Sequence, residues 1–234
     1  EAGQQVVELV RRGIRPSDIL TRGAFENAIR VNMAIGGSYN TFIHLPAIAH
    51  QLGIRLTAGD FDRLSDSTPY LCNLSPNGPC VLSQLAQAGG ILAVMKVLAP
   101  LLDLEAMTVT GQTVRANLEG IPLDLGKLPH PDVLRSLDNP LRPTGGLTVL
   151  AGNLAPDGAV IRSAGVLGSM LQFEGPARVF DSEHNAMAAV ARRDYRPGEV
   201  LVIRNEGIVG GPGMPEQSCV GWTLDRHGMY DKVY

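Results

Sequence analysis

The stretch ARVFDSEHNAMAAVARRDYRPGEVLVIRN, residues 177–205, predicts a strand, a helix and a second strand. Ser182 follows the first apolar run and can cap a helix, because its hydroxyl can accept from the amides of the first turn. Arg192 and Arg193 fall in the last turn of that helix, where the helix dipole favours positive charge. Pro197-Gly198 then provides a turn before the apolar run that ends at Ile203. This part of the chain is therefore predicted to be α/β.

The loop that follows, RNEGIVGGPGMPEQ at 204–217, contains four glycines, two prolines and two glutamates. A phosphate-binding loop would place a helix with Lys or Ser/Thr directly after the glycines, which this loop lacks. Two interpretations remain: a surface turn, or a loop held rigid by its prolines and glycines so that a carboxylate is fixed in direction. A fixed carboxylate from Glu206 or Glu216 suits a hard cation such as Mg²⁺.

A change of pattern in the middle of the chain predicts two domains. Residues 1–120 are mostly helical in pattern, whereas 145–234 alternates short β-rich runs with Gly, Pro and Asp turns. Five prolines fall between these regions, which predicts a linker at 121–144. We therefore expect an α/β chain in which a mostly helical domain is followed by an incomplete domain that mixes strands and helices.

In the helical half, Phe25, Ile29 and Met33 recur every four residues and predict the buried face of a helix that stops at Gly36-Gly37. The next helix begins after the loop GGSYN at 36–40. The polar side chains of this loop, Ser38 and Asn40, have two interpretations: helix caps, or groups directed from a helix N-terminus at an anionic substrate.

Further along the chain, residues 81–98 predict a helix broken at Gly89-Gly90, and MTVTGQT at 107–113 predicts a short β-branched strand. Asp60 and Asp62 are interpreted as a solvated helix start. His44 and His50 are six residues apart, which does not place them on one helix face as a metal pair, so structural roles are favoured.

Composition excludes several classes of protein. Lys and Arg total 20 and Asp and Glu 23, giving a net charge of −3 without charged blocks, which argues against nucleic acid or an anionic membrane as partner. No apolar run reaches the ~18 residues of a membrane span. The odd number of cysteines favours reduced thiols over a disulfide framework. We expect a soluble, cytoplasmic protein.

Several segments together resemble the dihydroxy-acid dehydratase family, which also contains sugar-acid and 6-phosphogluconate dehydratases. The matching stretches occur in family order from about residue 5 to residue 217. They are GIRPSDILTRGAFENAI, MAIGGSYNTFIHLPAIAH, DFDRLS, AGGILAVMKVL, MTVTGQTVRANL, RPTGGLTVLAGNLAPDGAVIRSAGV, FEGPARVFDSEHNAMAAV and GGPGMPE.

The resemblance implies a fold and a set of cofactors. Residues 1–120 would be the end of an α/β/α domain, and 145–234 the start of a β-barrel-like domain. The intact enzyme would carry Mg²⁺ and an iron–sulfur cluster, either 2Fe-2S or 4Fe-4S. Glu216 corresponds to the family's metal-binding glutamate, and Glu206 becomes a supporting residue. The cluster cysteines are expected before Glu1 and the catalytic serine after Tyr234, so this chain is expected to contain neither.

The same resemblance implies a reaction. Mg²⁺ would hold the carboxylate and hydroxyl of the substrate while a cluster iron acts as Lewis acid on the leaving 3-hydroxyl. The serine would take the C2 proton, and the resulting enol would become a 2-keto acid. Such an enzyme acts on a small dihydroxy or sugar acid and is expected to be a homodimer or homotetramer.

The substrate has alternatives. FEGPARVFDSE and GGPGM favour the branched-chain enzymes of amino-acid biosynthesis, with the sugar-acid (aldonate) dehydratases as second choice. Tyr39 departs from the Thr usual in this family, and Asn205 departs from the usual Tyr. A hypothesis of another class is a non-catalytic, truncated remnant that binds a partner or a small molecule.

Overall fold

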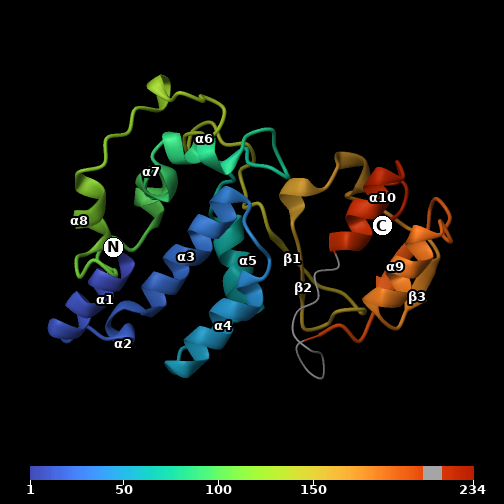
Figure 1. Cartoon of the computed structure of the whole chain (residues 1–234), viewed down its shortest axis with the longest axis horizontal. Helices are drawn as coiled ribbons and strands as arrows, with labels where there is room; N and C mark the ends of the chain where they lie inside the picture. The colour runs from blue at the N-terminus through green and yellow to red at the C-terminus, as the bar shows by residue number, and fades with distance from the viewer. Residues whose placement is uncertain (208–217) are drawn as a thin grey trace. The chain divides into compact units, whose positions relative to one another are not determined.

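The computed structural model describes residues 1–207 and 218–234 and divides the chain into two compact units, Glu1–Gly165 and Val166–Tyr234 (Figure 1). Among the described residues, no helix has both the length and the apolar character that crossing a bilayer requires.

The first unit is mainly helical, with one pair of strands near its end. Its helices are α1 (Ala2–Arg11), α2 (Pro16–Ile19), α3 (Arg22–Ile35), α4 (Thr41–Gln51), α5 (Ala58–Asp66), α6 (Leu82–Gln87), α7 (Gly90–Leu98) and α8 (Val114–Glu119). The strands β1 (Thr148–Leu150) and β2 (Ala159–Ile161) pair antiparallel, with Val149 opposite Val160.

Helix α3 is the centre of this unit and contacts α4, α5 and α7. Thr21 caps it by accepting from the Ala24 amide, and the predicted apolar positions Phe25, Ile29 and Met33 are all buried. The helix ends where Gly36 takes the left-handed conformation at φ 60°. The predicted helix and its glycine stop are thus confirmed.

Two other predictions for this unit had different outcomes. The break at Gly89-Gly90 is confirmed, since α6 and α7 are separate helices and both glycines have positive φ. The strand expected at 107–113 is wrong. This segment is a tight turn with a single bridge between Met107 and Thr113, closed by the Thr108 amide donating to Gln112 O. β-branched residues favour a strand only where a partner strand is available to pair with them.

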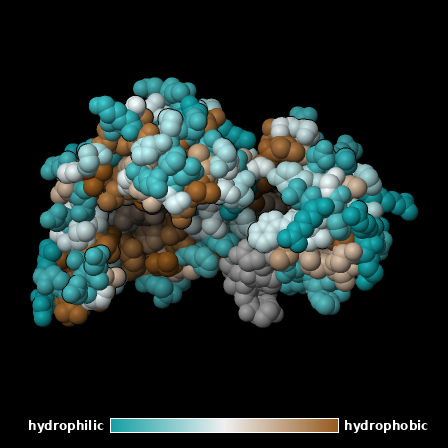
Figure 2. Space-filling view, turned by 45° about the horizontal axis from the view of Figure 1, so that its top comes forward, coloured by the Kyte–Doolittle hydropathy of each residue, from teal (hydrophilic) through white to brown (hydrophobic). Residues whose placement is uncertain are grey.

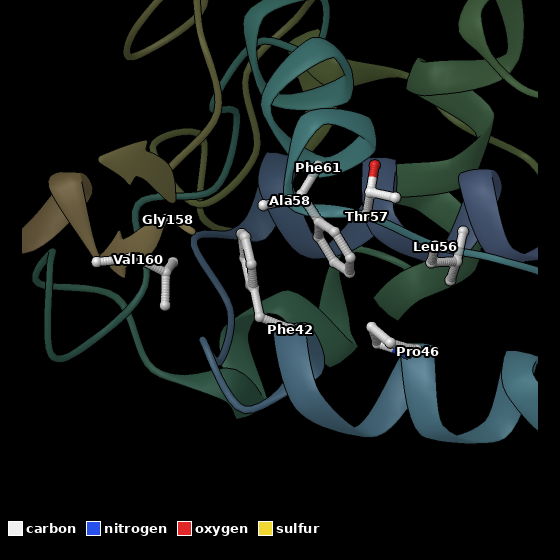
Figure 3. A pocket seen from close by; sticks show the side chains of 9 residues that line it. Phe42, Pro46, Leu56, Thr57, Ala58, Phe61, Gly158 and Val160 are labelled. Carbon is white, nitrogen blue, oxygen red and sulfur yellow. The ribbon is translucent and has the colours of Figure 1, made fainter. Parts of the chain in front are cut away.

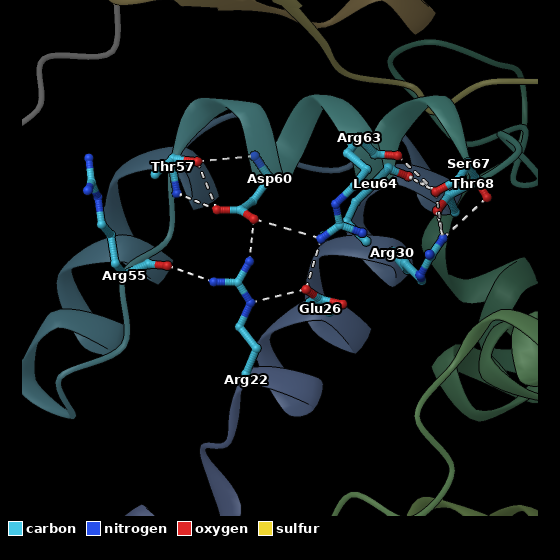
Figure 4. Close-up of polar contacts among 10 residues, drawn as sticks. All are labelled: Arg22, Glu26, Arg30, Arg55, Thr57, Asp60, Arg63, Leu64, Ser67 and Thr68. Atoms are coloured by element: carbon cyan, nitrogen blue, oxygen red, sulfur yellow. Dashed lines mark hydrogen bonds and ion pairs between the residues drawn. The ribbon is translucent and has the colours of Figure 1, made fainter.

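An ion-pair network joins α3 to α5 (Figure 4). Arg22 Nε and Arg63 Nη2 both donate to Glu26 Oε1, at 3.1 and 2.9 Å, and Arg22 also contacts Asp60. Asp60 and Thr57 form a capping box, in which Asp60 Oδ2 accepts from the Thr57 amide at 2.9 Å. The interpretation of Asp60 as a solvated residue is therefore corrected, whereas Asp62 is exposed.

A glycine pair, Gly145-Gly146, packs against the end of α3. The Gly146 amide donates to Met33 O at 2.9 Å, and the Gly145 amide donates to Ser65 O at 2.9 Å. A Cβ at Gly146 would lie 2.6 Å from Gly36 Cα, closer than real side chains come. Glycine is therefore required here by the close approach of two backbones.

The second unit contains the predicted strand, helix and strand. The elements are β3 (Ala177–Phe180), α9 (Glu183–Ala191) and β4 (Val200–Ile203), followed by α10 (Ser218–Arg226). β3 and β4 pair in parallel, with Val179 opposite Val202, and Ser182 caps α9 by accepting from the Asn185 amide. A core forms where α9 and α10 bury Ala186, Val190, Val220 and Leu224. The α/β prediction for this segment is confirmed.

The chain as a whole mixes helix and strand, as expected. Among the described residues the strands form two two-stranded sheets, and no barrel closes. Within the predicted linker, Val133 and Leu134 are buried in the core of the first unit, and 145–165 also belongs to that unit. The assignment of 121–144 as the boundary between two domains stays a prediction.

We predict that Asp60→Asn lowers the free energy of unfolding by about 1–2 kcal/mol at neutral pH, because it weakens a helix cap and removes an ion pair. Burial on its own raises the pKa of Asp60, but the hydrogen bonds from Thr57 and the charge of Arg22 outweigh burial and hold the pKa below its ordinary value. The contribution is therefore full above about pH 4–5 and is lost as the pH falls through the lowered pKa.

Urea denaturation of both proteins across this pH range measures the difference in stability. Asp62→Asn is the matched control, because Asp62 is exposed on the same helix and has no ion pair among the described residues. Equal losses from the two substitutions would contradict the role of Asp60.

The second prediction concerns the glycine pair. Gly146→Ala should cost about 1–3 kcal/mol in thermal or urea unfolding, because the added methyl forces apart two packed backbones. Gly152→Ala should change stability little, since no atom lies within 4 Å of a Cβ at that position. A neutral Gly146→Ala would show that the end of α3 and the glycine pair do not need their close contact.

Candidate functional site

The predicted site residues fall in different parts of the chain. Glu216, the expected metal ligand, lies in 208–217, outside the described residues. Glu206 is described, and its Oε1 accepts a hydrogen bond from the Glu183 amide at 2.6 Å, in the first turn of α9. The helix dipole favours a carboxylate at this position. Glu206 therefore attaches the chain just after β4 to the start of α9. Its relation to a metal stays a prediction.

Ser38 and Asn40 lie in the loop between α3 and α4. Ser38 Oγ accepts from the Asn40 amide at 3.2 Å, and Ser38 O accepts from Thr41 Oγ1 at 2.8 Å and from Asn32 Nδ2 at 3.2 Å. Asn40 occupies the cap position of α4, but its side chain makes no capping hydrogen bond. Ser38 thus supports the backbone of its own loop, and contact of either residue with a substrate stays a prediction.

Side chains from distant segments surround this loop. Gly36 brings the loop against Tyr70, since a Cβ there would lie 2.8 Å from Tyr70 Cε2. Asn77 Nδ2 donates to Gly36 O at 3.4 Å. The guanidinium of Arg162 lies over the Tyr39 ring, with its Cζ 5.6 Å from the ring centroid. We call Tyr39, Tyr70, Asn77, Arg142 and Arg162 the Gly36 loop cluster.

The backbone contacts of the glycine pair place this cluster. The Tyr70 amide donates to Arg142 O at 3.0 Å, and the Ala164 amide donates to Gly146 O at 3.0 Å. Arg142 Nη1 donates to Ser163 O at 2.6 Å. Residues 142–164 therefore fold back onto the end of α3 and bring two arginines towards the loop.

The sequence analysis did not identify Tyr70, Arg142 or Arg162 as site residues. The available signal was one arginine in each of two glycine-rich stretches, LRPTGG and VIRSAG. Burial raises the pKa of Tyr70, and the nearby Asn77 amide and the two arginine charges partly oppose that rise. Chemically, the cluster offers hydrogen-bond donors and positive charge.

A separate apolar pocket of about 290 Å³ lies between α4, the start of α5 and β2 (Figure 3). The rings of Phe42 and Phe61 stack in it with centroids 4.1 Å apart. Its lining contains Pro46, Leu56 and Val160 and no charged residue, so the pocket suits only an apolar group.

Hydrophobic side chains also gather in a hollow on one face of the first unit (Figure 2).

The cysteines and histidines do not form a metal site among the described residues, where no group of three or more His, Cys, Asp or Glu side chains is close enough to hold an ion. Cys72 and Cys80 are buried, and burial raises the pKa of Cys72 to about 12, which keeps that thiol protonated. Cys219 is exposed. His44 and His50 are exposed on α4.

Comparison with known families identifies both halves of the chain. Residues 1–117 match the family model described as "Dihydroxy-acid/6-phosphogluconate dehydratase N-terminal". Residues 132–234 match the corresponding "Dihydroxy-acid/6-phosphogluconate dehydratase C-terminal" model. The first match covers the helical region, and the second begins within the predicted linker.

Individual relatives agree with these matches. Dihydroxy-acid dehydratase of Moorella thermoacetica is 49% identical over 235 residues, which covers 100% of this chain and 42% of the relative. The enzyme of Acetivibrio thermocellus is 48% identical over 97% of this chain and 41% of the relative. Dihydroxy-acid dehydratase 1 of Methanosarcina acetivorans is 42% identical over 100% of this chain and 42% of the relative. The chain thus spans about two fifths of the length of these relatives, and it belongs to the dihydroxy-acid/6-phosphogluconate dehydratase family.

Proposed function

We propose that this chain is part of a hydro-lyase that converts 2,3-dihydroxy acids into 2-keto acids, namely a dihydroxy-acid dehydratase of branched-chain amino-acid biosynthesis. The supporting observation is that relatives with this name are 42–49% identical along nearly the whole chain. Since the chain spans about two fifths of their length, the activity is proposed for the whole protein. We further propose that the whole protein is a cytoplasmic homodimer or homotetramer.

The proposed reaction removes water from C2 and C3 of the substrate. The C2 proton leaves to a base, the 3-hydroxyl departs as water, and the enol that results becomes the 2-keto acid. We propose that the second unit forms part of a β-barrel-like domain, with β3 and β4 among its strands. Ser38 and Asn40 are proposed to contact the substrate from the loop after α3.

Mg²⁺ and an iron–sulfur cluster are the cofactors that this family implies, and the described residues of this chain do not fit either group. Among them, no group of three or more His, Cys, Asp or Glu side chains is close enough to hold an ion, so no ligand set for either cofactor comes together there. We propose Glu216 as the contribution of this chain to the Mg²⁺ site, on the basis of its sequence motif. Glu206 supports that segment through its hydrogen bond to α9.

A second candidate substrate is an aldonate. It is kept because Tyr39, in the Gly36 loop cluster, departs from the threonine usual in this family. A larger ring at this position alters the space beside the loop.

The substrate assignment is tested by steady-state kinetics of the full-length enzyme. We expect kcat/KM for a branched 2,3-dihydroxy acid to exceed that for a C5 or C6 aldonate by at least about a hundredfold, since differential transition-state binding sets such ratios. A preference for the aldonate would replace the first assignment by the second. Absence of both activities would contradict a dehydratase.

The metal assignment is tested by two matched substitutions in the full-length enzyme. Glu216→Gln keeps the side-chain volume but removes an anionic oxygen, so activity at limiting Mg²⁺ should fall at least about tenfold. Glu206→Gln keeps an oxygen that can accept from the Glu183 amide, so the activity of this variant should fall only slightly. Mg²⁺ titrations of activity provide the measurement. If Glu206→Gln loses much of its activity while Glu216→Gln keeps normal activity, the wrong carboxylate has been assigned.

A further inference from the structure

Two arginines beside the Gly36 loop lack acidic partners. Among the described residues, neither Arg142 nor Arg162 forms an ion pair, whereas seven other arginines do. Within the described part of the chain, the side chain of Arg142 donates to Ser163 O, and Arg162 Nε is buried without a hydrogen-bond partner. Buried donors are normally satisfied, and an unsatisfied one on a charged group is costly. The missing partner is therefore expected to be an anion.

A third donor lies in the same place. Tyr70 is 4% exposed, and its hydroxyl makes no hydrogen bond of full geometry among the described residues, although the Asn77 amide lies near enough to lower its pKa. The charges of both arginines act on this phenol. The amide of Asn77 also lies nearby, and its Nδ2 donates to Gly36 O. Arg142, Arg162 and Tyr70 thus place three donor groups in one neighbourhood, and no carboxylate among the described residues pairs with them.

The position of Arg162 is set by the loop itself. Its guanidinium lies over the Tyr39 ring, an arrangement that attracts a cation to the ring face and restricts the arginine. Arginine presents a planar fork of donors that matches the two oxygens of a carboxylate.

We propose that Arg142, Arg162 and the Tyr70 hydroxyl form a subsite for the carboxylate of a small organic acid, with Tyr39 as the positioning residue for Arg162. The assignment of the ligand as an acid substrate rests on the proposed function. The proposed residues all lie in the first unit, Glu1–Gly165.

The test measures binding of lactate, a short 2-hydroxy acid, to the full-length protein after EDTA treatment, by calorimetry. Lactamide is the uncharged control ligand, and inorganic phosphate is the alternative oxyanion. We expect lactate to bind and lactamide not to bind. Arg162→Gln should weaken lactate binding roughly tenfold, because it removes a charged hydrogen-bond donor. Arg55→Gln is the matched control, because it removes an exposed arginine of the same unit.

Two further variants distinguish a binding role from a structural one. Tyr70→Phe removes a buried, unpaired hydroxyl, so it should raise the midpoint of thermal unfolding without ligand while weakening lactate binding. Tyr39→Thr should weaken binding several-fold, whereas Tyr39→Phe keeps the ring and should stay within about twofold.

Any one of three results would overturn the subsite. Lactate binds Arg162→Gln as tightly as it binds the unchanged protein, lactamide binds as tightly as lactate, or phosphate binds and lactate does not. Failure of the proposed function is separate, because an enzyme without dehydratase activity can still show lactate binding that depends on Arg162. Conversely, if the enzyme is active but its affinity for lactate does not depend on Arg162, the proposed function stands and only the subsite is contradicted.

Discussion

The close contact between Gly146 and Gly36 is the constraint on which the first unit depends. Two backbones meet there with no room for a Cβ, and the Gly146 amide donates to Met33 O at the end of α3. This contact attaches residues 142–164, which include β1 and β2, to the central helix of the unit. Any side chain at Gly146 would separate the strand pair from α3. The glycine pair thus determines both the packing of the unit and the position of the residues beside the loop.

The electrostatics of the first unit have two contrasting parts. On the α3–α5 side, the charges of Arg22 and Arg63 are paired with Glu26 and Asp60, so these two positive charges are neutralised within the fold (Figure 4). Beside the Gly36 loop, Arg142 and Arg162 have no such carboxylates among the described residues. Arg162 keeps a buried Nε that has no partner in the described part of the chain, and an unsatisfied donor on a charged group costs stability.

In the second unit, two side chains complete the start of α9. Glu206 Oε1 is already occupied by the Glu183 amide, and Ser182 caps the same helix from its own side chain. Both contacts satisfy amides that the first turn of a helix leaves free. Glu206 therefore fixes the chain after it leaves β4, and its relation to Glu216 stays a prediction.

The sequence by itself determined the local elements, because their signals lie within a few residues of one another. Thr21, the spacing of Phe25, Ile29 and Met33, and Gly36 specify α3 from start to stop, and Ser182 and Pro197-Gly198 specify the strand–helix–strand segment. The strand predicted at 107–113 failed because a strand needs a partner, which local sequence does not supply. Only the tertiary structure decided that Arg142 and Arg162 lie beside a loop at 36–40, since a contact across more than a hundred residues depends on how the backbones pack at Gly146.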